Sequence, residues 1–259
     1  METLAGWGPA LNIDGCARLV ESGDTERFRV LMSLAPEMRA RLMPLFAFNV
    51  EVSRAPWMTK EPMIAEMRLQ WWRDAIAEIG AGGLIRNHEV TVPLALVVRE
   101  SEIDTECLDQ MIAARRWDIY MEPFEDMVHF ERYLEQTSGG LFVAAAQALS
   151  CNAADLSFAQ TLGKWAGLAN FLRAVPRLEA SGKRLFHESD VPVIRDLAQK
   201  ALAELAAIPA RKGSALRLVH RFGWLARPTL EKVVRNPDAV NTGGLEFSEF
   251  QKRFRLLFT

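Results

Sequence analysis

Apolar residues recur three and four positions apart over most of this chain, which is the spacing of helices with one buried face. The stretch 37–52 shows this best, because Met38, Leu42, Leu45 and Phe48 fall on one broad apolar face. No period-two alternation of useful length occurs, so we predict no β-strands. The predicted helices are 11–20, a segment capped by 24 or 25, 37–52, one starting at 59–62 and ending at 79, 93–98, one capped by 104 and running to 120, 126–150, 155–174, 193–208, 214–224, 228–234 and 247–258.

Glycines make one of these helices unusual. Gly139 and Gly140 lie in the middle of the predicted helix 126–150. Each glycine costs a helix about 1 kcal/mol relative to alanine. We therefore expect a close helix contact, or the approach of a ligand, at this place.

Length and composition favour one globular domain. The chain has 259 residues, of which 49% are apolar and 25% are charged, and no linker rich in Gly or Ser divides it. A chain of this size can bury a sizeable core. We therefore predict a single all-α helical bundle over 1–259. The net charge of −2 disfavours nucleic acid as a partner.

The cysteines and histidines do not suggest a metal site. Cys16, Cys107 and Cys151 lie far apart without C-x-x-C spacing, which suits a reducing compartment. The four histidines show no metal-ligand spacing. Residues 1–15 lack the pattern of a signal peptide, and the longest apolar segment, 140–149, is shorter than the roughly 20 residues of a membrane span. We expect a cytoplasmic protein with no metal ligands.

Four strings occur in a characteristic order over 24–190. They are Phe46-Ala47-Phe48, Arg68-Leu69-Gln70-Trp71-Trp72-Arg73, Tyr133 with Gly139-Gly140, and Asn170-Phe171-Leu172-Arg173. Together they resemble the squalene/phytoene synthases. The resemblance implies an isoprenoid-synthase fold with a central cavity. The substrate- or cavity-binding residues it implies are Phe48, Arg68, Trp71, Trp72, Tyr133, Gly139, Gly140, Asn170 and Arg173.

The chemistry of that family requires two D-x-x-x-D motifs, whose carboxylates hold Mg²⁺ ions that bind prenyl diphosphate. At the first motif this chain has Ser53 and Trp57, and at the second it has Ala174 and Leu178. None of these four side chains is a carboxylate. We therefore predict that magnesium-dependent ionisation of a diphosphate is lost.

A few acids remain near the lost motifs. Glu51 and Glu179 flank them, and Asp118 precedes the Tyr133 helix, as an acid also does in the synthases. Arg54 and Arg177 place positive charge where the metal would sit. The acid pairs with helical i,i+4 spacing could in principle replace the motifs, although such pairs are common on solvated helix faces. These pairs are Asp74/Glu78, Asp118/Glu122 and Glu131/Glu135.

The substitutions themselves point to one branch of the family. The residues at 48–51 and 172–176 resemble the branch that includes a mitochondrial complex I assembly factor, whose acidic motifs are degenerate. The resemblance implies a non-catalytic factor that assembles respiratory complex I and binds its subunits, with an isoprenoid or lipid in the cavity. Because the first residues do not have the pattern of a mitochondrial transit peptide, we expect a bacterial protein. The alternative is an active head-to-head prenyltransferase that uses Mg²⁺ with Glu51, Glu179 and Asp118. A third reading is an isoprenoid carrier.

Two features have readings that the sequence leaves open. Trp71 and Trp72 are about 100° apart on a helix, so we expect one in the core and one lining a groove. Arg68, Arg73 and Arg173 either bind an anion or form ion pairs, the first two with Asp74, Glu66 or Glu78.

The last predicted helix, 247–258, is amphipathic. Phe247, Phe250, Phe254, Leu257 and Phe258 share one face. The helix either caps the bundle or lies on a partner subunit or an anionic membrane, which would place the protein at the periphery of the inner membrane.

Overall fold

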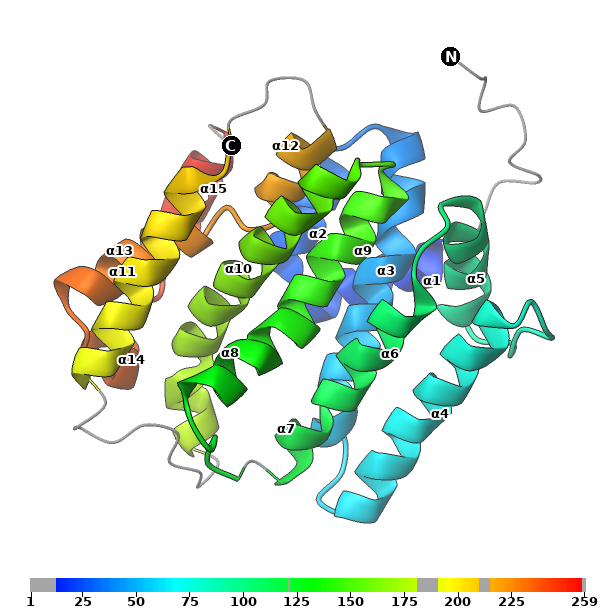
Figure 1. The fold of residues 1–259 in the computed structure, drawn as a ribbon, viewed down its shortest axis with the longest axis horizontal. Helices are drawn as coiled ribbons and strands as arrows, with labels where there is room; N and C mark the ends of the chain where they lie inside the picture. Colours follow the sequence, from blue (N-terminus) through cyan, green and yellow to red (C-terminus); the bar gives the residue numbers. More distant parts are fainter. Residues whose placement is uncertain (1–12, 121, 181–190, 210–214, 258–259) are drawn as a thin grey trace. The chain divides into compact units, whose positions relative to one another are not determined.

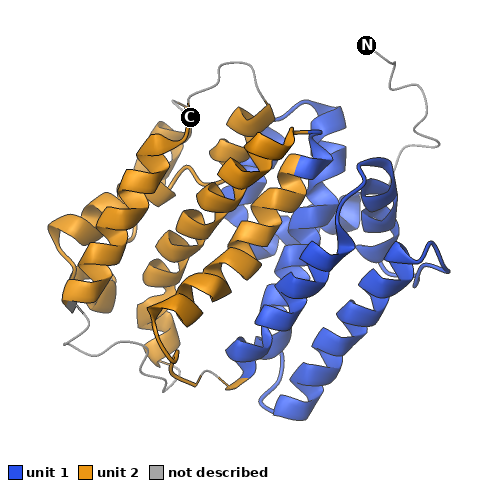
Figure 2. Cartoon of the chain, viewed as in Figure 1, with its two compact units in different colours: residues 1–119, 147–150 blue, residues 120–146, 151–259 orange. Residues whose placement is uncertain are grey.

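The computed structural model describes residues 13–120, 122–180, 191–209 and 215–257. Helices make up the regular structure of these ranges and no strand occurs in them, which confirms the all-α prediction. The helices form two compact units (Figure 2), one of residues 1–119 with 147–150 and the other of 120–146 with 151–259. The predicted single domain over 1–259 and the predicted central cavity are not tested by this division and stay predictions.

The first unit is built around α3 (Figure 1). Residues 42–50 of this helix are all buried, and α1 and α5 pack against it. Helix α4 begins at Pro62. Proline suits the first turn of a helix because it has no backbone N–H group that would need an acceptor there. The helices are α1 (Asp14–Gly23), α2 (Thr25–Met32), α3 (Pro36–Arg54), the 3₁₀ turn η1 (Ala55–Trp57), α4 (Pro62–Gly80), α5 (Thr91–Glu100), α6 (Thr105–Ala114) and α7 (Arg116–Tyr120), whose last residue belongs to the second unit.

The second unit is built around the long helix α10, against which α8, η2, α11, α12, α13 and α14 pack. Figure 1 shows α10 running beside α8 and α9. Its helices are α8 (Met127–Leu134), η2 (Glu135–Gly139), α9 (Gly140–Ala148), α10 (Ala153–Ala180), α11 (Val191–Ala207), α12 (Ala215–Arg221), α13 (Ala226–Arg235), α14 (Ala239–Thr242) and α15 (Glu249–Leu256).

The glycine patch makes a close helix contact, as the sequence predicts. Residues 135–139 form one turn of π-helix between α8 and α9, and this turn packs against α10. A Cβ atom on Gly163 would lie 2.6 Å from the carbonyl oxygen of Ser138, and one on Gly139 would lie 2.7 Å from the amide of Gln160. Glycine on both sides therefore allows the two backbones to approach.

Several predicted boundaries were wrong by one or more turns. Helix α10 continues through Pro176 to Ala180, because a proline removes a single backbone hydrogen bond and the buried Val175 still anchors the helix. The segment predicted as one helix to Tyr120 is divided at Arg115 into α6 and α7. Asp24 and Asp104 do cap their helices, by accepting bonds from backbone N–H groups. In the described ranges, no helix is both long and apolar enough to cross a membrane.

Candidate functional site

A pocket of about 230 Å³ occupies the position of the first acidic motif. It lies within the first unit, between the end of α3 and the middle of α4. Basic and aromatic side chains dominate its lining, which consists of Glu51, Arg54, Ala55, Met58, Arg68, Trp71, Trp72 and His88.

The one carboxylate of this pocket is already paired. Arg54 forms an ion pair with Glu51 one helical turn earlier. Ser53 donates its hydroxyl to the carbonyl of Val50 at 3.1 Å, as serines within helices often do. Trp57, at the other motif position, is 46% exposed and does not line the pocket. The first motif therefore offers a neutralised acid and a bonded hydroxyl in place of two aspartates.

Aromatic rings form one wall of the pocket. Trp72 is 4% exposed and packs edge-on against Phe48 at 5.5 Å and Trp71 at 5.0 Å. His88 contacts both tryptophan rings at 5.4 Å. Trp71 is half-buried, and the guanidinium of Arg86 lies 5.3 Å from its ring. The structure thus places one tryptophan in the core and the other in a groove, as predicted.

The arginines of α4 have different roles from one another. Arg73 forms a two-bond ion pair with Asp109 of α6, at 2.7 and 2.8 Å, which raises the pKa of Arg73. Arg68 is exposed at the pocket, and no carboxylate of the described ranges pairs with it. The prediction that these arginines pair with Asp74, Glu66 or Glu78 was wrong, because side chains from other segments reach those acids first.

Those acids are held by Arg86 and Arg116. Arg86 binds Glu78 through two hydrogen bonds of 2.8 Å and lies 3.6 Å from Asp74. The hydrogen bonds lower the pKa of Glu78. Arg116 reaches Glu66 at 2.8 Å. The pair Asp74/Glu78 is therefore engaged by a cation of the protein itself.

The second motif lies on α10 in the second unit. Ala174 and Leu178 are partly buried and have no side-chain oxygen. Arg173 pairs with Glu246 at 3.1 Å, which joins α10 to the segment before α15. Two further positions of α10 are exposed, Asn170 and Arg177, and Glu179 is partly buried. The face that carries aspartates in the family's motif is apolar and basic in this chain.

Three of the other candidate acids are paired as well. Asp118 is buried and accepts a bond of 3.1 Å from Arg115, three residues earlier. Glu131 and Glu135 both bind the ammonium of Lys164, at 2.6 and 2.7 Å. These three acids thus belong to ion pairs, which is the ordinary role for charged residues at helical spacing.

Burial and hydrogen bonding compete at Glu131. Burial alone would raise its pKa, but bonds from Lys164 and Lys200 outweigh this effect and hold the pKa below its ordinary value. For Lys164, burial would lower the pKa, and the bonds to Glu131 and Glu135 raise it instead. Glu131 and Lys164 are therefore both charged at neutral pH.

The remaining cavity residues of the prediction lie in packed surroundings. Tyr133 is buried, 5.6 Å from Phe124 and 6.3 Å from Phe171 between ring centroids. Gly139 faces Gln160 of α10, as described above, and Gly140 begins α9. No observation tests whether any of these residues contacts a substrate, so their role stays a prediction.

Magnesium does not fit the residues at either motif. Mg²⁺ requires several oxygen ligands in nearly octahedral geometry. Ser53 and Trp57 cannot supply them, Glu51 is paired with Arg54, and Ala174 and Leu178 have no donor atoms. Within the ranges that the structure describes, no three His, Cys, Asp or Glu side chains gather as a metal site.

The sequence and the fold define the same class of protein. The chain belongs to the squalene/phytoene synthase family, because the sequence model of that family matches residues 20–186. A dehydrosqualene synthase has the same fold, with a TM-score of 0.79 over 95% of this chain and 94% of that chain, at 15% identity.

The curated relatives are assembly factors by name. The NADH dehydrogenase (ubiquinone) complex I, assembly factor 6 homolog of Drosophila melanogaster is 30% identical over 62% of this chain and 50% of its own length. The assembly factor 6 of Bos taurus is 25% identical over 71% of this chain and 55% of its own length. The chain thus spans about half the length of the curated relatives that it matches.

Sequence reasoning missed one ion pair of the first-motif pocket, its lining residue His88, and Arg86, which lies over the ring of Trp71. The pairing of Glu51 with Arg54 could have been read from their i,i+3 spacing. Arg86 and His88, by contrast, come from the loop after α4, and no local pattern places that loop against Trp71. A second pocket, lined by α12, α13 and α15, was also missed.

Proposed function

We propose that this chain assists the assembly of respiratory complex I and does not ionise prenyl diphosphates. One observation carries the proposal: the four motif positions that hold magnesium in this family are occupied by Ser53, Trp57, Ala174 and Leu178, and Arg54 neutralises the nearest remaining acid. A diphosphate needs Mg²⁺ to offset its charge as it leaves. The assembly role itself is supported by the names of the curated relatives.

The partners in this proposal are complex I subunits, bound through protein surfaces. We place the protein in the cytoplasm of a bacterium, at the membrane that holds the complex. A lipid or isoprenoid in the inherited cavity is part of the proposal, and no cofactor is needed for an assembly role.

Deletion of the gene from its host tests the assembly role. We expect less assembled complex I and a lower NADH:quinone oxidoreductase activity, with unchanged carotenoid and hopanoid pools. Complementation with the wild-type chain should restore the activity. Normal complex I in the deletion strain would refute the proposal.

A second test addresses the alternative of an active prenyltransferase. Purified protein is incubated with farnesyl or geranylgeranyl diphosphate and Mg²⁺, and diphosphate release is measured. We expect none above the rate without protein, whereas an intact family synthase releases it. Magnesium-dependent release by this chain would establish the enzyme instead.

A further inference from the structure

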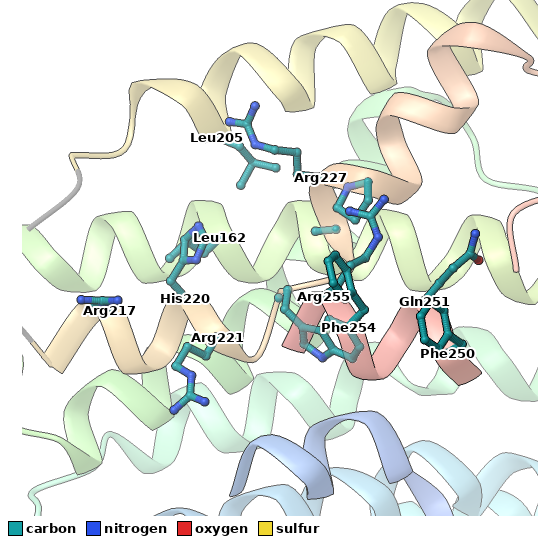
Figure 3. Close-up of a pocket in the computed structure, with 14 residues that line it drawn as sticks. Leu162, Leu205, Arg217, His220, Arg221, Arg227, Phe250, Gln251, Phe254 and Arg255 are labelled. Carbon is teal, nitrogen blue, oxygen red and sulfur yellow. The ribbon is translucent and has the colours of Figure 1, made fainter. Parts of the chain in front are cut away.

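A second pocket, of about 670 Å³, lies within the second unit, away from both motif segments in the chain (Figure 3). Helices α12, α13 and α15 supply most of its lining, and Leu162 of α10 and Leu205 of α11 complete it. Its volume is within the range of pockets that hold small organic ligands. No part of the proposed assembly role uses it.

The charged groups of this pocket are all basic. Among the described residues that line it are four arginines and one histidine, and no aspartate or glutamate. Arg217 of α12 and Arg227 of α13 are exposed, and no carboxylate in the described ranges forms an ion pair with them. Figure 3 shows that the basic side chains come from three different helices. Like charges that share one pocket repel one another, and a bound anion would relieve that repulsion.

His220 adds a hydrogen-bonding group to this basic lining. Its pKa lies below the ordinary value because the pocket walls exclude water and because Arg227 repels the protonated ring. The side chain nonetheless borders the open pocket and is exposed there. At neutral pH the ring is therefore uncharged and can donate one hydrogen bond to an anion.

The other side of the pocket is aromatic and uncovered. Phe250 and Phe254 of α15 are 78% and 54% exposed, and their rings stack at 6.3 Å with an angle of 18°. No residue of α15 is buried, although Lys232 and Glu246 fix the segment that leads into it. Phe247, which lies just before α15 in the predicted helix 247–258, is buried, so capping the bundle and contacting a partner or a membrane both stay predictions. Covering apolar surface is worth roughly 25 cal/mol per Å², so a ligand that lies over these rings gains affinity.

We propose that this pocket binds an anionic amphiphile with one acyl chain. Arg217, Arg227 and their neighbours pair with its phosphate or carboxylate head, because guanidinium groups match both oxyanions. The acyl chain covers Phe250 and Phe254. Free phosphate would leave the rings uncovered. An acidic peptide would bring backbone amides, and the lining has few neutral polar groups to satisfy them.

Calorimetry on the full chain tests the proposal, with oleoyl lysophosphatidate below its micelle concentration as the probe. We expect saturable binding of one molecule per chain. Oleate tests whether a carboxylate can replace the phosphate. Neutral monooleoylglycerol and inorganic phosphate should each bind at least about tenfold more weakly than the probe, since the first has no anionic head and the second has no acyl chain.

Two double variants locate the site. Arg217→Gln with Arg227→Gln removes head contacts, and Phe250→Ala with Phe254→Ala removes the apolar wall. All four side chains are exposed, so we expect folding to be kept, as circular dichroism would verify. Each double variant should weaken binding at least about tenfold. The matched controls are Arg253→Gln on α15 and Leu257→Ala directly after it. Both lie outside the lining and should stay within about twofold.

Several results would overturn the proposal. They are the absence of saturable binding, equal affinity for inorganic phosphate, equal loss in the control variants, and binding to anionic vesicles without binding of the monomeric probe. Displacement of the probe by a lower concentration of an acidic peptide would assign the pocket to a protein partner instead.

Discussion

Single residues decide the character of the first-motif region, where Trp72 of the pocket is buried and Trp57, outside the pocket, is exposed. Trp72 is buried between Phe48, Trp71 and His88, whereas Trp57 extends to solvent from η1. Trp72→Ala should lower the free energy of unfolding by about 3–5 kcal/mol, because it leaves a large cavity. Trp57→Ala, the matched control, should change it by no more than about 0.5 kcal/mol. Urea unfolding followed by circular dichroism measures both, and equal losses would contradict this packing.

The cysteines make a second prediction at the residue scale. Burial raises the pKa of Cys16 to about 12 and those of Cys107 and Cys151 to about 11, with nearby carboxylates adding to the effect. Only thiolates react with alkylating agents.

At pH 8, we expect Cys107 and Cys151 to react with iodoacetamide about 10²-fold more slowly than free cysteine, whose pKa is about 8.5, and Cys16 about 10³-fold more slowly. Mass spectrometry of peptides gives the rate at each site. Denaturation in guanidinium chloride should restore the ordinary rate, which separates burial from any chemical modification. A native site that reacts as fast as free cysteine would contradict the prediction.

At the element scale, the sequence predicts existence and type of the helices better than their ends. The long helices α3, α4 and α10 are strongly periodic and were found from the sequence. The short α14 was missed, because a helix of one turn has no periodicity to detect. The sequence indicated the π-turn at 135–139 only through glycines in the middle of a predicted helix. The turn itself depends on the close approach of α10, which no local pattern reports.

The side-chain partners of the site could not be predicted, because they come from distant segments. Arg73 meets Asp109 thirty-six positions away, and Lys164 meets Glu131 thirty-three positions away. For Arg73, acids much nearer in the sequence, such as Asp74 and Glu78, are available. The packing of the helices decides which acid a cation reaches, and the local pattern of a single sequence does not predict that packing.

The network of Lys164, Glu131 and Lys200 joins α8, α10 and α11, and its protonation predicts how stability depends on pH. The folded pKa of Glu131 is lowered, so its contribution is present above its unfolded pKa and is lost as the pH falls through the folded value. The folded pKa of Lys164 is raised, so its contribution is present below its unfolded pKa and is lost as the pH rises through the folded value.

Lys164→Gln should therefore cost most near pH 7, with a difference from wild type that shrinks toward pH 3 and toward pH 12. Urea unfolding across that range gives the free energies. Lys60→Gln is the matched control, because Lys60 is exposed and no ion pair of the described residues includes it. A difference for Lys164→Gln that does not vary with pH would show that the network is not the cause.

At the scale of the whole molecule, the chain keeps the family's helical fold and lacks the carboxylates of its two acidic motifs. The helical scaffold depends on many apolar positions, so it tolerates the loss of a few carboxylates. The family's reaction depends on four positions, and each is changed here. This difference explains why the resemblance could predict the fold, while the residues at the four motif positions predicted that the family's reaction is absent.

The absence of the motif carboxylates predicts how the folded protein responds to magnesium. A ligand at a hundred times its dissociation constant stabilises a protein by about 2.7 kcal/mol. For a chain of this size, that would raise the melting temperature by about 5–10 °C. Because Ser53, Trp57, Ala174 and Leu178 do not supply ligands, Mg²⁺ with a non-hydrolysable prenyl diphosphate analogue should raise it by less than about 1 °C. Differential scanning fluorimetry measures the shift, with a family synthase that retains both acidic motifs as the positive control. A rise of several degrees that requires both magnesium and the analogue would mean that other carboxylates replace the lost aspartates.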